Sequence, residues 1–159
     1  MTDIASARAP GLLRRLAAIL YDLLLLAAVI VVAAFIYTLS IESLTGADLT
    51  QGTARLTFQL FLLAVILGYY LFFWTHGRQS LAMRTWRITL LRGDGAPLGL
   101  GDALRRIGFA VLTLAPLGLG LWWQLFDRDG QTWYDRLAGT RTVLLRTGAA
   151  AAAASKETR

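Results

Sequence analysis

The feature that most constrains this chain is an apolar stretch from Leu16 to Ser40 that contains a single charged residue, Asp22. A hydrocarbon core about 30 Å thick is crossed by about 20 residues of α-helix, so this stretch is long enough to span a membrane with some tilt. A cleaved signal peptide is a poorer interpretation, because its apolar part is only about 7–15 residues long. We therefore predict a retained membrane helix that carries an acidic residue.

Two further apolar segments follow. Residues 56–74 carry no charge and end in a cluster of aromatic side chains, as expected where a second membrane helix meets the interface. Residues 107–126 are also long enough to cross, but Pro116, Gly118 and Gly120 interrupt them. These breakers indicate either a kinked span or the tip of a re-entrant hairpin. Non-helical backbone at that depth is tolerated only where protein or water covers it.

The composition supports a membrane protein and excludes several other classes. Apolar residues make up 56% of the chain and charged residues 16%, against about 45–50% and about 25% in soluble domains. The net charge of +6 comes from fifteen Arg and one Lys. In so apolar a chain it indicates cytoplasmic loops rather than a nucleic-acid partner. With no Cys, a single His and no nucleophile–base pair, we expect no metal site, no cofactor and no enzymatic activity.

The distribution of basic residues predicts the topology. They are concentrated before the first apolar segment, between the second and third, and after the third, whereas residues 41–55 contain only Arg55. Because basic loops stay in the cytoplasm, we expect a protein of the cell (inner) membrane. Its N-terminus should lie on the cytoplasmic side and residues 41–55 on the outer side. A single crossing by residues 107–126 would place a basic C-terminus outside. A re-entrant return keeps every basic segment inside and is the arrangement we favour.

The sequence as a whole predicts an all-α integral membrane protein with two transmembrane helices and a third apolar segment. Residues 84–92 are rich in β-branched and apolar residues, and a turn cluster follows them. Residues 98–106 read as a short amphipathic helix that lies on the interface, with its Arg side chains toward anionic lipid headgroups. The predicted divisions are an N-terminal arm (1–9), a membrane domain (10–147) and an Ala-rich tail, frayed or disordered, without assigned function (148–159).

Asp22 is the most informative residue for function, because a carboxylate at that depth costs about 2.5–3.5 kcal/mol even on a lenient insertion scale. Arg15 lies on the same helical face, but the helical rise separates the two Cα atoms by about 10 Å. We therefore expect Asp22 to reach a group on another element. Two interpretations remain open: a proton or cation site in a transport path, or a buried anchor that is neutral or paired with an Arg from residues 76–106 or the C-terminal segment.

The remaining candidates lie at the predicted cytoplasmic interface. Arg15 either extends to lipid phosphate or pairs with an acid such as Asp135, which follows the third apolar segment. His76 is most simply an interfacial polar residue, with a proton relay as the alternative. The possible supporting residues at this interface are His76, Arg84, Arg87 and Arg136.

Three ordered stretches resemble the RDD family of small integral membrane proteins, which is named after one arginine and two aspartates. They are PGLLRRLAAILYD, WTHGRQSLAMRTWRITLLRGDGAPLG and LFDRDGQTWYDRLAGTRTVL, and together they cover roughly residues 10–145. The resemblance assigns Arg15, Asp22 and Asp135 as signature residues. One departure is Ala82, where the family usually has Gly. The resemblance implies transport of unidentified ligands and, for some members, sodium/proton antiport.

Two functions follow as hypotheses. The first is a cation/proton antiporter or small-solute transporter for Na+, Li+, K+ or H+, in which Asp22 exchanges protons, Arg15 tunes its pKa and Asp135 orients Arg15. Two spans and a hairpin are too few to enclose a pathway, so this function requires a homo-oligomer. The alternative is a non-catalytic structural or accessory membrane protein, which binds a partner protein or anionic lipid through its basic cytoplasmic face.

Overall fold

The computed structural model describes residues 9–46, 52–116 and 118–145. Most of the N-terminal arm and all of the Ala-rich tail predicted from the sequence lie outside these residues. The described chain is mostly helical, as predicted, with one small sheet. Its elements are α1 (Leu12–Thr45), α2 (Gly52–Trp74), α3 (Leu81–Thr85), β1 (Ile88–Arg92), α4 (Leu100–Leu114), α5 (Leu119–Trp122), the 3-10 helix η2 (Trp123–Leu125), α6 (Trp133–Leu137) and β2 (Thr140–Leu144).

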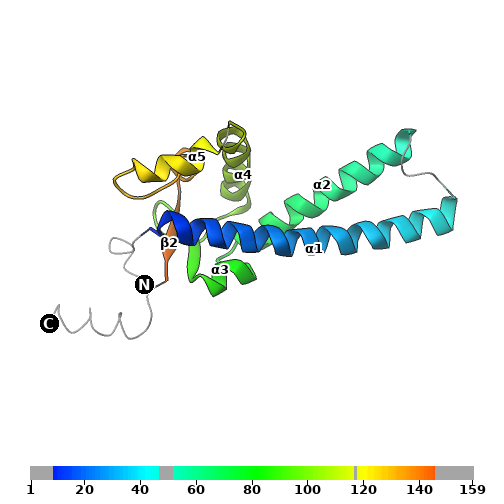
Figure 1. Ribbon diagram of the computed structural model, residues 1–159, viewed down its shortest axis with the longest axis horizontal. Helices are drawn as coiled ribbons and strands as arrows, with labels where there is room; N and C mark the ends of the chain where they lie inside the picture. Colours follow the sequence, from blue (N-terminus) through cyan, green and yellow to red (C-terminus); the bar gives the residue numbers. More distant parts are fainter. Residues whose placement is uncertain (1–8, 47–51, 117, 146–159) are drawn as a thin grey trace.

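Helices α1 and α2 form a long hairpin that extends away from the other elements (Figure 1). They contain 34 and 23 residues, which corresponds to about 51 Å and about 35 Å of helix. Among the described residues these two helices are long and apolar enough to cross a membrane by themselves. Both predicted spans are therefore confirmed as continuous apolar helices, and each begins about one turn earlier than its apolar segment.

One narrow face of α1 is buried, and most of the remaining surface is apolar. The buried residues Arg15, Ala18, Asp22 and Leu26 recur every three or four positions, so they form a single stripe. This stripe lies in the half of α1 that the smaller elements surround (Figure 1). Beyond Leu26 the large apolar side chains of α1 are mainly exposed, as expected for a surface that faces lipid or another protein chain.

The small sheet was not part of the prediction. Strands β1 and β2 pair antiparallel, from Ile88 opposite Leu144 to Arg92 opposite Thr140. The two strands are short and lie far apart in the sequence, so their pairing cannot be predicted from either strand alone. The pairing matters for topology, because β1 precedes the third apolar segment and β2 follows it. Both ends of that segment therefore lie on the same side of the protein, which supports the re-entrant arrangement.

The third apolar segment differs in detail from the prediction. A single helix, α4, contains most of the predicted interfacial segment 98–106 and the first part of 107–126. After Leu114 the chain bends by 103° into α5 and η2. Gly118, at φ 73°, caps the start of α5 in the left-handed region that glycine adopts readily. The predicted boundary at Arg106 was wrong, because α4 continues through this residue, and the Arg106 side chain is buried in the protein instead of facing lipid headgroups.

A small apolar core fixes the elements that follow α2. Met83 of α3, Leu90 of β1 and Leu98 pack together, and Trp74 at the end of α2 packs against them. Ser80 caps α3 by accepting a hydrogen bond from the backbone N–H of Met83 at 3.2 Å. This core holds the sheet at the end of α2 and thereby sets the position of β2.

Candidate functional site: a buried ion cluster and an adjoining cavity

Asp135 is held in the interior by the first turn of α6. The Thr132 hydroxyl accepts from the Asp135 backbone N–H, and the Asp135 carboxylate accepts from the Thr132 N–H, each at 3.3 Å. This reciprocal capping box fixes the direction of the Asp135 side chain. The residue is completely buried.

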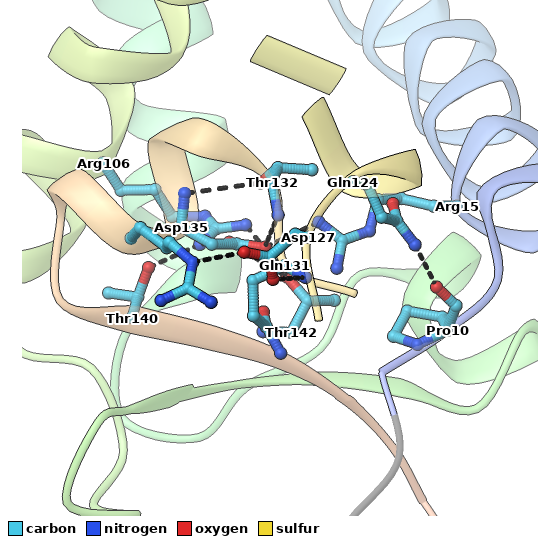
Figure 2. Close-up of polar contacts among 11 residues, drawn as sticks. Pro10, Arg15, Arg106, Gln124, Asp127, Gln131, Thr132, Asp135, Thr140 and Thr142 are labelled. Carbon is cyan, nitrogen blue, oxygen red and sulfur yellow. Dashed lines mark hydrogen bonds and ion pairs between the residues drawn. The ribbon is translucent and has the colours of Figure 1, made fainter. Parts of the chain in front are cut away.

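Two arginines from different helices meet the Asp135 carboxylate (Figure 2). The Nη1 of Arg15, from the first turn of α1, lies 2.6 Å from Oδ2. The Nη1 of Arg106, from α4, donates to Oδ1. Both arginine residues are only 3% exposed. Of the two alternatives for Arg15, the structure therefore has the ion pair with Asp135, and the side chain does not extend to the lipid interface.

Strand β2 completes the cluster with two hydroxyl groups on one face. Thr140 Oγ1 accepts from Arg106 Nη1 at 2.6 Å. Thr142 Oγ1 accepts from Arg106 Nη2 at 3.1 Å and donates to the Asp135 carboxylate at 3.2 Å. The Arg106 guanidinium also lies 5.2 Å and 5.1 Å from the ring centroids of Trp74 and Tyr134, within the range of cation–π interactions. The cluster thus joins α1, α2, α4, α6 and β2.

The charges of the cluster do not cancel. Burial alone would raise the pKa of Asp135, but the attraction of Arg106 and Arg15 outweighs it and holds this pKa below its ordinary value. Asp135 is therefore ionised, and one carboxylate faces two guanidinium cations. Among the described residues, three buried donors have no hydrogen-bond partner: Nε and Nη2 of Arg15 and Nε of Arg106.

Asp22 is separate from this cluster. Its Oδ1 accepts a hydrogen bond of 2.8 Å from the Tyr69 hydroxyl of α2. Asp22 therefore contacts another element, as expected, and the contact is with a tyrosine. In the described part of the chain, none of the Arg side chains from residues 76–106 or the C-terminal segment forms an ion pair with it, so the predicted Arg pair is not found there; Arg146 and Arg159 lie outside the described residues.

A cavity connects the Asp22 region with the ion cluster. It has a volume of about 390 Å³ and lies between α1, α2 and α4, with further lining from α3, β1, α6 and β2. Arg15, Arg106 and Thr142 contribute to its wall at one end, and Asp22 lies about two helical turns away along α1. The remaining lining is mainly apolar and includes Ile107, Ala110, Val111 and Leu114. The volume falls within the range of about 300–1,000 Å³ that is common for small-molecule sites.

The proposed supporting residues lie elsewhere. His76, Arg84, Arg87 and Arg136 are exposed, and none of them lines this cavity or contacts Asp135 through the bonds described above. Arg136 instead pairs with Asp127 at 2.6 Å and Asp129 at 2.9 Å. The sequence interpretation missed the residues that do complete the site, which are Tyr69, Arg106, Thr132, Thr140 and Thr142.

A comparison with protein families identifies the family of this chain. The model of the RDD family matches residues 9–139, which is most of the chain. The chain belongs to the RDD family. The matched range contains Arg15, Asp22 and Asp135, and in this RDD protein Arg15 and Asp135 contact each other directly. Neither the comparison with curated proteins nor the comparison with solved structures gave a match.

Proposed function

We propose that this RDD-family membrane protein is a small-solute transporter of the inner cell membrane, with Asp22 as the group that gains and loses a proton. The observation that carries the proposal is the position of Asp22, which lines a cavity and accepts its hydrogen bond from a neutral tyrosine. An acid inside a membrane helix is costly and usually functional. Cation/proton antiport with Na+, Li+ or K+ is one form of this proposal.

The other two signature residues have a supporting role in this proposal. Arg15 and Asp135 form an ion pair that attaches the start of α1 to α6. The pair fixes the position of Arg15 at one end of the cavity, and Arg106 of α4 binds the same carboxylate. Asp135 is completely buried and is not among the cavity residues, so it acts on a ligand only through Arg15 and Arg106.

Transport by this fold requires a homo-oligomer. Two long helices cannot enclose a pathway by themselves, and many large apolar side chains of the hairpin are exposed, such as Phe35 at 63% and Leu39 at 53%. A second copy would cover part of this surface and complete a path from Asp22 to the far side of the membrane.

The orientation in the proposal places the N-terminus in the cytoplasm. Because the chain contains no Cys, single cysteines can report it directly. We expect Asp94→Cys and Arg128→Cys to react with an impermeant maleimide only after cells are opened, and Ser43→Cys to react in intact cells. Labelling of Arg128→Cys in intact cells while Asp94→Cys stays protected would rule out the re-entrant arrangement.

Flux in proteoliposomes tests the proposal itself. With a pH-sensitive dye inside the vesicles, Na+, Li+ or K+ is added in turn, and the wild type is compared with Asp22→Asn. We expect a cation-dependent pH change that is lost in Asp22→Asn but retained in Glu42→Gln, a matched acid-to-amide change at the exposed far end of α1. Both variants should keep the wild-type gel-filtration profile. Absence of a pH change in the wild type with all three cations would exclude cation/proton antiport as the function.

A second candidate function is a non-catalytic accessory protein that binds a partner protein or anionic lipid headgroups through its basic cytoplasmic face. It is favoured by the ion cluster, because Arg15, Arg106 and Asp135 are buried and mainly join elements of the fold. In this case Asp22→Asn lowers thermal stability or yield and there is no flux to lose. Capture of anionic vesicles by the wild type, reduced by removing exposed Arg side chains, would then be the positive result.

A further inference from the structure

The cavity between α1, α2 and α4 has opposite electrostatic character at its two ends. At one end Arg15 and Arg106 carry two positive charges against the single carboxylate of Asp135. At the other end Asp22 is the only acidic residue of the lining. Residues Ile107, Ala110 and Leu114 of α4 form part of the apolar wall between them. A ligand that complements all three regions has an anionic group, an apolar body and a cationic group.

We infer that this cavity binds a small zwitterion with an apolar body, of the class of an apolar amino acid or short peptide. Its carboxylate lies at the Arg15 and Arg106 end, and its ammonium group lies toward Asp22. The separation of about 10 Å between the Cα atoms of Arg15 and Asp22 suits a compact molecule whose two charges are several ångströms apart. The inference rests on the same cavity as the proposed function, but it does not require that the ligand crosses the membrane.

The chemistry of the lining favours such a ligand over a bare metal ion. Sodium, potassium and similar hard cations are bound by several oxygen ligands. Here Asp22 is the only carboxylate, and most of the wall is apolar. A carboxylate near Arg15 and Arg106 would also offset the excess positive charge of the ion cluster. Buried guanidinium donors without partners carry a free-energy cost, which an anionic ligand at this end reduces.

The first experiment varies the ligand and not the protein, because substitution of Arg15 or Arg106 would also destabilise the fold. Isothermal titration calorimetry measures binding of the dipeptide Leu-Leu to the full-length protein in nanodiscs of a neutral phosphatidylcholine. The two matched analogues are N-acetyl-Leu-Leu, which lacks the cationic group, and the C-terminal amide, which lacks the carboxylate. We expect saturable binding of the zwitterion. Each analogue should bind roughly tenfold more weakly, because it lacks one charge interaction with a partly buried group. Equal affinity for all three ligands, or no saturable binding, would overturn the inference.

Three variants then locate the bound ligand: one tests its ammonium group, one fills the cavity, and the third is a control outside the cavity. Asp22→Asn should remove the preference for Leu-Leu over N-acetyl-Leu-Leu and leave the preference over the amide unchanged. Ala110→Phe fills the cavity and should abolish saturable binding, whereas Leu112→Phe, on an exposed position of the same helix, should not. Retained binding in Ala110→Phe would place the ligand elsewhere and overturn the inference.

The same measurement separates a free solute from a lipid. A phosphatidylethanolamine headgroup carries a primary ammonium group that can donate hydrogen bonds to Asp22, unlike the quaternary ammonium of phosphatidylcholine, so nanodiscs with and without phosphatidylethanolamine are compared. Displacement of the dipeptide by the lipid supports the inference with a lipid as the natural occupant, and unchanged affinity supports it with a free solute. Binding of Leu-Leu without a cation-dependent pH change in the proteoliposome assay would leave this inference standing and exclude cation/proton antiport, so the two proposals can fail separately.

Discussion

The two ends of the α1–α2 hairpin differ in what surrounds their side chains. Around Arg15 and Asp22 the helix packs against the smaller elements, and its polar side chains are matched by residues that come from far along the chain. Toward Glu42 the hairpin has mainly apolar exposed surface and few polar contacts between its helices. The first region is specified within one chain, whereas the second depends on lipid or a second chain to cover it.

The difference between the two ends of the hairpin explains how a short chain can contain a polar site within a membrane protein. The small elements after α2 bury the charges of Arg15 and Arg106 next to Asp135, so no charge of this cluster faces hydrocarbon. The exposed end of the hairpin then needs only apolar side chains. Substitutions should therefore have large effects near the cluster and small effects toward the loop between α1 and α2.

The largest effect is expected for Asp135→Asn. This change leaves the buried guanidinium groups of Arg15 and Arg106 without an anionic partner, and breaking a buried ion pair from one side typically costs about 3–5 kcal/mol. Thermal unfolding in a mild detergent, followed by gel filtration with fluorescence detection, measures the loss. Asp129→Asn is the matched control, because Asp129 pairs with Arg136 at the surface. An Asp135→Asn protein as stable as this control would contradict the role of the cluster.

The second prediction concerns pH and the same carboxylate. Because the arginines hold the pKa of folded Asp135 below its ordinary value, its contribution is complete above the pKa of an unfolded Asp, about 3.9. Below that pH the unfolded state binds the proton more readily, and the contribution is lost as pH falls through the folded-state pKa. The wild-type unfolding midpoint, measured from pH 7 to pH 3, should fall more steeply than that of Asp135→Asn. Parallel curves would show that Asp135 does not contribute to the acid sensitivity.

The third prediction tests packing where α4 meets α5. A Cβ added at Gly120 would lie 2.6 Å from Thr113 Cβ and 3.1 Å from the Thr113 carbonyl oxygen. Gly120→Ala should therefore destabilise the protein by about 1–3 kcal/mol. Gly108→Ala is the control on α4, because a Cβ there meets no atom within 4 Å, and it should be neutral or stabilising by up to about 1 kcal/mol. Similar unfolding midpoints for the two variants would indicate a looser bend than described.

The sequence predicts the hairpin better than the cluster. A long apolar run with one acid is enough to predict a membrane helix, so α1 and α2 were found with boundaries within about one and a half turns. The interpretation that Asp22 reaches another element also follows from helical geometry alone. The RDD resemblance supplied Arg15 and Asp135, and their pairing was already one of the two alternatives for Arg15.

The missed features depend on contacts between residues distant in sequence. Arg106 lies beside Arg105, and both side chains were predicted to face anionic lipid headgroups, but the side chain of Arg106 is buried and that of Arg105 is exposed. Thr140 and Thr142 alternate along β2, which places them on one side of the strand. That alternation was a usable signal, but its meaning depended on a pairing with β1 that no local pattern reveals.

The smallest effect is expected at the exposed end of the hairpin. The Tyr37 hydroxyl donates to Thr57 Oγ1 at 3.2 Å, and the Tyr37 ring stacks on Phe61 with centroids 4.6 Å apart. Tyr37→Phe keeps the ring contact and removes only the hydrogen bond, which is worth about 0.6 kcal/mol on average between membrane helices. Tyr69→Phe makes the same chemical change beside the cavity, where it leaves the Asp22 carboxylate without its donor and should cost about 1–3 kcal/mol. Unfolding midpoints of the two variants, measured side by side, compare the ends of the hairpin directly. A larger loss for Tyr37→Phe than for Tyr69→Phe would reverse the expected order and show that contacts near the loop, not those near Asp22, hold α1 to α2.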